Sequence, residues 1–240
     1  MLGGSTNLRR EAAGVRSGDL SGIAANEIAW WGRPYVFPPV ELALLTDWEE
    51  KIEQIARLAL KEEIRSISGT PNWLLILFDK LSELRQDLEP CLASYFPRLE
   101  LLIHGGINFR PYEKRFAELL EGSRAELREV YPASEAFVAI ADRGKDEGLR
   151  LLVDNGVFYE FVPTEELDAE APTRHWLGTI QTGLEYAVIL STCAGAWGYV
   201  LEPFRFRWKH SRRFAGSFGI RGPTRAGQAE RGDFGWHQDI

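Results

Sequence analysis

Cysteine and histidine are scarce in this chain of 240 residues, and their positions exclude several kinds of site. The two cysteines, Cys91 and Cys193, have no metal-ligand or redox partner at short spacing. The histidines lie far apart, at positions 104, 175, 210 and 237, so no zinc cluster is predicted. This cysteine usage fits a reducing compartment, and we expect a cytoplasmic protein.

Long apolar runs are also missing. No stretch of about 18 apolar residues occurs, and the N-terminus lacks a charged start followed by an apolar stretch and a cleavage site. We therefore expect neither a membrane span nor a secretory signal. The net charge of −7 argues against general nucleic-acid binding. With 45% hydrophobic residues, the chain can still bury a real core of one or two domains.

The apolar pattern alternates between helical and strand periodicity. A capping box, Thr46 to Glu49, begins a helix predicted over 47–64, and Thr70 with Pro71 begins a second helix with a broad apolar face. A strand at 99–103, a helix at 111–120 and a strand at 126–130 form a predicted βαβ unit. Further strands are predicted at 136–141, 149–153, 157–162, 186–191 and 199–206. The turn at 154–156 predicts a hairpin between the strands 149–153 and 157–162.

Two motifs lie at the carboxyl ends of predicted strands, where open α/β sheets bind ligands. His104-Gly105-Gly106 follows the first strand of the βαβ unit, and glycine lets the backbone approach a flat or phosphorylated ligand. Tyr131-Pro132-Ala133-Ser134-Glu135 follows the second strand and combines an aromatic ring, a hydroxyl and a carboxylate. These groups suit a purine, a phosphate oxygen and Mg²⁺, while a buried tyrosine and a solvated turn glutamate are the simpler alternative.

Several further motifs occur in order with these two and extend the pattern along the chain. The central ones cover 96–100, 103–106, 109–112 with Phe116, 131–135 and 156–163; others lie upstream at 18–23, 30–31, 33–34, 36–39 and 69–73, and downstream from 191–195 to about 201. Together they make the chain resemble the auxin-responsive acyl-acid amido synthetases, a branch of the adenylate-forming ligases, over about residues 18–201.

This resemblance implies an α/β fold, a mixed sheet with flanking helices that forms the central part of the large domain. It implies a reaction in which ATP and Mg²⁺ activate a small carboxylic acid as an acyl-adenylate, and the acyl group then passes to an amino acid amine. Tyr131 would lie against the adenine, with Ala133 in the same nucleotide-binding turn. Ser134 would bind the phosphate region, Glu135 would hold Mg²⁺, and Gly105 with Gly106 would line the adenine side.

His104 has two interpretations. It would polarise a carboxylate or phosphate oxygen as a catalytic residue, or form a structural hydrogen bond at the end of an apolar strand.

Both ends of the chain depart from the family pattern. The phosphate-binding loop of the superfamily would lie upstream, and Gly3-Gly4-Ser5-Thr6 does not replace it because no strand precedes it. Glu202-Pro203 stands where the family has a Gly-Asp pair that binds the ribose. We expect a chain truncated at both ends, with a poorly ordered segment 1–17 and a partial adenylation domain 18–202.

Residues 203–240 hold eight Lys or Arg against three acids, and we expect them to form a divergent, disordered basic tail. Two alternatives to the amido synthetase remain open. One is a remnant that keeps a nucleotide slot without turnover, and the other is a ligase that passes the acyl group to coenzyme A.

Overall fold

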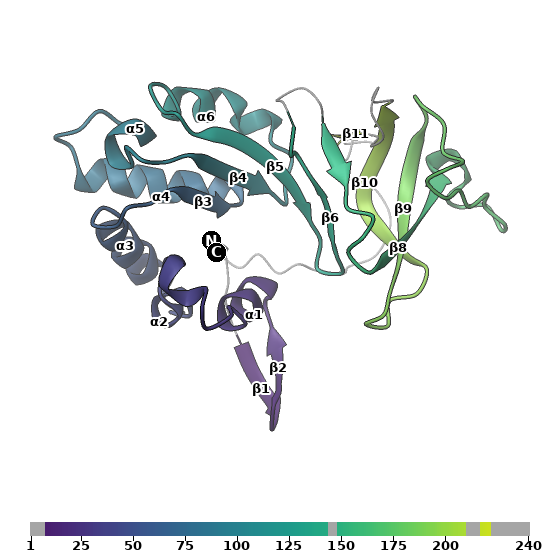
Figure 1. Cartoon of the computed structure of the whole chain (residues 1–240), viewed down its shortest axis with the longest axis horizontal. Coiled ribbons are helices and arrows are strands. Elements are labelled where there is room, and N and C mark those ends of the chain that lie inside the picture. Colours follow the sequence, from purple (N-terminus) through teal and green to yellow (C-terminus); the bar gives the residue numbers. More distant parts are fainter. Residues whose placement is uncertain (1–7, 144–147, 210–216, 222–240) are drawn as a thin grey trace. The chain divides into compact units, whose positions relative to one another are not determined.

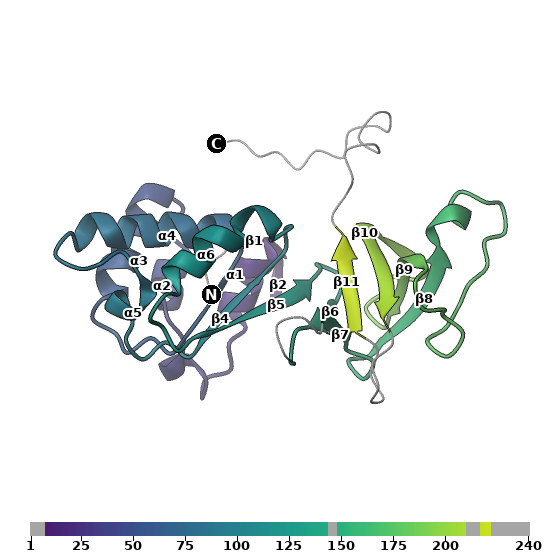
Figure 2. The ribbon, with the colours of Figure 1, turned by 90° about the horizontal axis from the view of Figure 1, so that it is seen from above.

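A computed structural model describes residues 8–143, 148–209 and 217–221, and the described chain divides into two compact units (Figures 1 and 2). The first unit is Met1–Lys145 and the second is Asp146–Ile240. This boundary lies inside the range 18–202 that the sequence predicts as one partial domain.

The first unit contains six strands and six α-helices, with two short 3₁₀ turns, among its described residues. Their bounds are β1 Leu8–Ala12, β2 Val15–Gly18, α1 Leu20–Asn26, η1 Arg33–Tyr35, α2 Val40–Ala43, α3 Trp48–Ala59, β3 Ser66–Gly69, α4 Pro71–Leu84, α5 Leu92–Tyr95, β4 Leu101–Gly105, η2 Arg110–Tyr112, α6 Glu113–Leu119, β5 Glu126–Pro132 and β6 Phe137–Ile140.

The helix α3 begins one residue later than the predicted capping box. The Asp47 carboxylate, not the Thr46 hydroxyl, accepts a hydrogen bond from Glu50 N, at 2.9 Å. The helix ends at Ala59 rather than at residue 64, because the next backbone bonds, Lys61 N to Leu58 O and Glu62 N to Ala59 O, are those of a tighter turn. No apolar face continues through the charged residues that follow.

The helix α4 follows β3 directly and begins as predicted. Thr70 occupies its N-cap position and Pro71 its first turn, where the missing proline N–H costs nothing. The Thr70 side chain itself makes no capping hydrogen bond.

The strands β3 to β6 of the first unit pair partly in parallel and partly antiparallel. The strands β3, β4 and β5 pair in parallel, and β6 pairs antiparallel to β5. The predicted βαβ unit is therefore confirmed as β4, α6 and β5. Its register aligns Gly69 with His104 and His104 with Glu129, so the carboxyl ends of the three parallel strands lie at one edge of the sheet.

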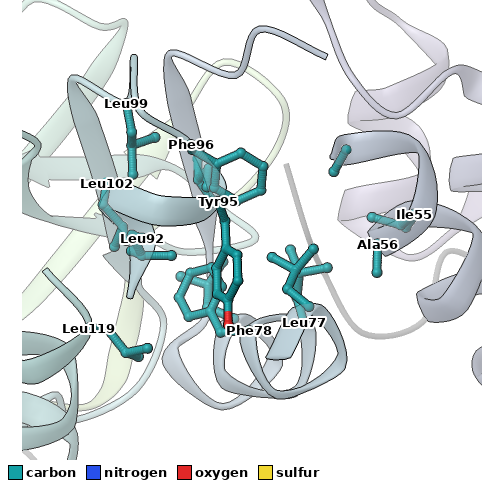
Figure 3. Close-up of a cluster of buried hydrophobic side chains, with 14 of the residues drawn as sticks. Ile55, Ala56, Leu77, Phe78, Leu92, Tyr95, Phe96, Leu99, Leu102 and Leu119 are labelled. Atoms are coloured by element: carbon teal, nitrogen blue, oxygen red, sulfur yellow. The ribbon is translucent and has the colours of Figure 1, made fainter. Parts of the chain in front are cut away.

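The core of this unit lies where helices pack on one face of the parallel strands (Figures 2 and 3). Leu74 and Leu81 of α4, Leu102 of β4 and Phe116 of α6 are fully buried there. Burial of such side chains contributes about 1.5–3 kcal/mol each. This packing fixes the helices, and with them the strand ends.

The second unit is an antiparallel sheet in the order β7-β11-β10-β9-β8. The predicted hairpin at 154–156 is wrong, because β7 pairs with β11 and β8 pairs with β9. The bounds are β7 Leu149–Leu151, β8 Val157–Pro163, η3 Thr164–Glu166, β9 Glu185–Thr192, β10 Tyr199–Lys209 and β11 Ser217–Arg221.

The two segments that we expected to be disordered contain strands. The strands β1 and β2 pair antiparallel across residues 8–18, within and just beyond the segment 1–17. The strands β10 and β11 occupy residues up to 209 and 217–221, so they enter the predicted tail 203–240. Residues 1–7, 210–216 and 222–240 of those segments lie outside the described residues.

Candidate functional site

The candidate site lies at the carboxyl edge of the parallel strands in the first unit. Gly105 is buried there, and a Cβ atom at this position would lie 2.3 Å from the carbonyl oxygen of Val130 and 3.1 Å from Cδ of Pro132. Real Cβ atoms do not approach an oxygen so closely, so glycine is required for β4 to pack against β5. Gly105 therefore serves strand packing first.

Gly106 is the open member of the glycine pair. It is exposed and has a φ of +83°, a left-handed backbone conformation that glycine adopts without strain. A Cβ atom there would lie 3.2 Å from Cγ2 of Thr70. Thr70, the residue after β3, is thus the direct neighbour of Gly106 at this edge.

The predicted turn 131–135 closes a hairpin between β5 and β6. Ala133 N donates to Ala136 O at 2.9 Å, and Pro132 pairs with Phe137. Ser134 is exposed at the tip of the turn, while Ala133 and Glu135 are partly exposed. The hydroxyl and the carboxylate are therefore accessible to a ligand, and their roles toward phosphate and Mg²⁺ stay predictions.

The ring of Tyr131 is buried, with an exposed fraction of 3%. Burial raises the pKa of its phenol, and the negative charge of Glu135 raises that pKa further. The ring has no open face for a stacked purine in this conformation. The structure therefore matches the alternative of a buried tyrosine, and a role of Tyr131 toward adenine stays a prediction.

His104 is buried beside an aromatic cluster. Its ring is 3% exposed and stacks on Phe109, with ring centroids 3.7 Å apart and planes inclined by 19°. Phe109 in turn meets Phe116 edge-on, at 5.2 Å. Burial lowers the pKa of His104 to about 4, so the imidazole is neutral at pH 7. Its Nδ1 atom has no hydrogen-bond partner among the described residues.

Two polar residues at this edge of the sheet were not predicted as site residues from the sequence. Glu129 pairs in register with His104, and burial and the charge of Glu113 raise the pKa of its carboxyl. The Thr70 hydroxyl oxygen is buried and, within the described part of the chain, accepts and donates no hydrogen bond. Leu127, Glu129 and Tyr131 are two residues apart and therefore share one face of β5. A carboxylate between two apolar residues on one face was the signal in the sequence that pointed to Glu129.

A cavity of about 710 Å³ lies elsewhere in the first unit, and it is lined by Arg33 to Pro39, by Glu62 to Ser68 and by apolar side chains of α3 and α4. Gly106, Ser134 and Glu135 do not line it. No group of three or more His, Cys, Asp or Glu side chains within 8–143, 148–209 and 217–221 has the geometry to hold a metal ion. None of the helices among these residues is long and apolar enough to cross a membrane.

The fold is that of the adenylate-forming ligases. A GH3.15 acyl acid amido synthetase structure matches with a TM-score of 0.66 and 13% identity, over 91% of this chain and 47% of that one. An open conformation of 2-hydroxyisobutyryl-CoA ligase, in complex with 2-HIB-AMP and CoA, matches with a TM-score of 0.55 and 12% identity, over 74% of this chain and 37% of that one.

Within that class the chain resembles the GH3 family, on a partial match. Residues 150–202 match the GH3 family central domain. A second amido synthetase structure, AtGH3.15 in complex with 2,4-DB, matches with a TM-score of 0.58 and 12% identity, over 74% of this chain and 40% of that one. The chain spans about half the length of the structures it matches. No curated protein matches the sequence significantly.

Proposed function

We propose that this chain belongs to an acyl-acid amido synthetase that uses ATP to adenylate a small carboxylic acid and then transfers the acyl group to an amino acid amine. The observation that carries the proposal is the exposed backbone of Gly106 after β4, together with the exposed Ser134 and the partly exposed Glu135 in the turn after the neighbouring strand β5, on a fold similar to that of adenylate-forming ligases. In α/β sheets, the carboxyl ends of the parallel strands are where ligands bind.

The reaction needs such a site because a carboxylate does not react with an amine at neutral pH. One carboxylate oxygen attacks the α-phosphorus of ATP, and the bond from that phosphorus to the pyrophosphate oxygen breaks. The amine then attacks the acyl carbon, and AMP leaves. In our proposal Gly106 lets the nucleotide lie against the backbone, Ser134 donates to a phosphate oxygen, and buried Tyr131 supports the turn from behind.

Glu135 is the proposed ligand of a magnesium ion, which would neutralise charge on the departing pyrophosphate. The donor chemistry fits, because a carboxylate oxygen is a ligand that Mg²⁺ prefers. A single protein carboxylate is also sufficient, since Mg²⁺ in nucleotide sites takes its remaining ligands from phosphate and water. Glu135 is partly exposed, which leaves room for those ligands.

The test is acid-dependent release of pyrophosphate by the whole chain, with ATP, Mg²⁺ and a panel of aromatic and fatty acids. The proposal predicts release with at least one acid and formation of an amide when amino acids are added. A chain that binds AMP but releases no pyrophosphate with any acid would instead be a remnant of the enzyme.

A ligase that forms coenzyme A thioesters is the second candidate, favoured by the similarity to 2-hydroxyisobutyryl-CoA ligase. The same incubation, given coenzyme A and amino acids in parallel, separates the two. Mass spectrometry of the product reports an amide in the first case and a thioester in the second.

A further inference from the structure

We propose that the first turn of α4 and the adjoining end of β4 form the site for the carboxylate of the acid substrate, with the Thr70 hydroxyl and the His104 imidazole as its side-chain donors. This inference rests on the proposed function and adds to it the place where the acid is held. It uses Thr70, which the sequence indicated only as the start of a helix.

The first observation is the state of the helix terminus. A Thr at the N-cap position normally accepts a hydrogen bond from the first turn, but the Thr70 side chain does not. The first backbone bond of the helix is Leu74 N to Thr70 O, at 3.0 Å. The N–H groups of Asn72 and Trp73 therefore have neither an intrahelical acceptor nor a capping side chain, and they lie at the positive, N-terminal end of the helix dipole.

The second observation is the burial of two polar atoms at the same edge. Thr70 Oγ1 and His104 Nδ1 are both buried, and neither has a hydrogen-bond partner in the described part of the chain. Burying such an atom without a partner costs about 1–3 kcal/mol. Buried polar atoms without a protein partner are places where a ligand or a water molecule binds, and only 3% of the His104 surface is exposed.

The sheet brings these two side chains to the same helix terminus. Gly69 of β3 is level with His104 of β4, and Thr70 follows Gly69 directly. His104 lies on the same face of β4 as Leu102, two residues earlier, and Leu102 packs in the core with Leu74 and Phe78 of α4. His104 therefore lies at the carboxyl end of β4, level with the residue that immediately precedes Thr70.

The chemistry of the donors selects a carboxylate. A hydroxyl and an imidazole N–H, with two backbone N–H groups, offer donors to two oxygens at the positive end of a helix. The low pKa of His104 keeps the imidazole uncharged at neutral pH. Neutral donors orient the carboxylate without the charge neutralisation of a salt bridge, so its oxygen remains able to attack the α-phosphorus. The Phe109 ring holds the imidazole on one side by stacking.

The test is an NMR titration of the full chain with benzoate, in the absence of ATP. We expect benzoate to shift the backbone amide signals of Asn72 and Trp73 and the imidazole nitrogen signals of His104, and benzamide, the uncharged isostere, to shift them far less. The Thr70→Val variant should bind benzoate about tenfold more weakly, because it loses a hydrogen bond to a charged group, while Thr70→Ser should keep the affinity within about twofold.

In this titration, any of three results would overturn the inference. Thr70→Val could bind benzoate as tightly as the wild type does, or the wild type could bind benzamide as tightly as benzoate. Inorganic phosphate could also shift the same amide signals more strongly than benzoate and displace it. The last would assign the site to the nucleotide. Thr70→Val is expected to fold, because the native side chain makes no capping bond, and a thermal unfolding curve checks this.

The titration does not depend on turnover, so the two proposals fail separately. Benzoate binding at Thr70 in a chain that releases no pyrophosphate would contradict the proposed function and leave the carboxylate site standing. Pyrophosphate release that is unchanged by Thr70→Val across the acid panel would contradict the carboxylate site and leave the proposed function standing.

Discussion

Gly105 is the residue on which the geometry of the site depends most strictly. A methyl group there would overlap the carbonyl oxygen of Val130, an atom of the backbone that cannot move without separating β4 from β5. The sequence indicated this glycine as a place for a ligand to approach. The structure shows that another strand approaches instead, and that Gly106 is the residue left open.

We predict that Gly105→Ala lowers the free energy of unfolding by about 2 kcal/mol or more, through overpacking between two paired strands. Urea denaturation followed by circular dichroism measures the change. Gly32→Ala is the matched control, because its Cβ would meet ordinary contacts, at 3.4 Å from Ala29 O and 3.6 Å from Ile28 Cγ2. The control should change the stability by less than about 0.5 kcal/mol. Equal effects of the two substitutions would contradict the close approach.

His104 should make the stability depend on pH. Its folded pKa of about 4 lies below the ordinary value of 6.5, so the unfolded chain takes up the proton first as the pH falls. The stabilisation is complete above about pH 6.5 and is lost progressively toward pH 4. The shift corresponds to about 3 kcal/mol, at about 1.4 kcal/mol for each pKa unit.

Glu129, the carboxyl in register with His104, also has a shifted pKa, and its effect must be separated from that of the histidine. The raised pKa of Glu129 favours its protonated form in the folded state, so this group contributes stability at low pH that is lost as the pH rises. Urea unfolding from pH 7 to pH 4 should give a steeper loss in the wild type than in His104→Phe, and Glu129→Gln should make that loss steeper still. A His104→Phe profile that is parallel to the wild type would contradict the buried neutral imidazole.

Among the residues of the proposed site, the sequence indicated those that are marked by local chemistry. Glycine pairs and a Tyr-Ser-Glu turn are visible in the sequence, and both lie at strand ends as predicted. Thr70 and Glu129 were not predicted as site residues, because their placement depends on the register between strands. The spacing of residues also did not predict the burial of Tyr131, because that burial depends on which side chains of the whole unit pack around the ring.

The helix α3 gives a direct test of a capping assignment. Asp47→Ala should lower the stability by about 1 kcal/mol, because it removes the acceptor of the Glu50 N–H and a negative charge at the helix N-terminus. Thermal or urea unfolding measures this change. Thr46→Ala, at the position that the sequence pattern favoured, should have almost no effect. A larger loss of stability in Thr46→Ala than in Asp47→Ala would instead assign the capping role to Thr46.

The elements that the sequence predicted correctly are those set by local signals. The βαβ unit of β4, α6 and β5 follows from two apolar strands around an amphipathic helix. The hairpin at 154–156 failed because a turn signal decides only that the chain turns. Gly156 does adopt a φ of +78° there, but β7 and β8 find partners far away in the chain, β11 and β9.

The division of the whole chain into two units was not predicted. The boundary between Lys145 and Asp146 has no proline or serine-rich linker, and no change of charge marks it in the sequence. The family-model match, at 150–202, lies entirely in the second unit, while the candidate site lies in the first. The sequence resemblance covered both units without separating them, because motifs in order carry no information on which strands share a sheet.

One measurement tests the central claim most directly: magnesium-dependent pyrophosphate release by the whole chain, compared between the wild type, Glu135→Gln and the control Glu121→Gln. Glu121 is an exposed carboxylate outside the candidate site. We predict that Glu135→Gln loses a factor on the order of 10–100 in magnesium affinity or rate while its unfolding curve is unchanged, and that Glu121→Gln behaves as the wild type. Acid-dependent release that is equal in all three proteins would contradict the assignment of adenylation to this edge of the sheet.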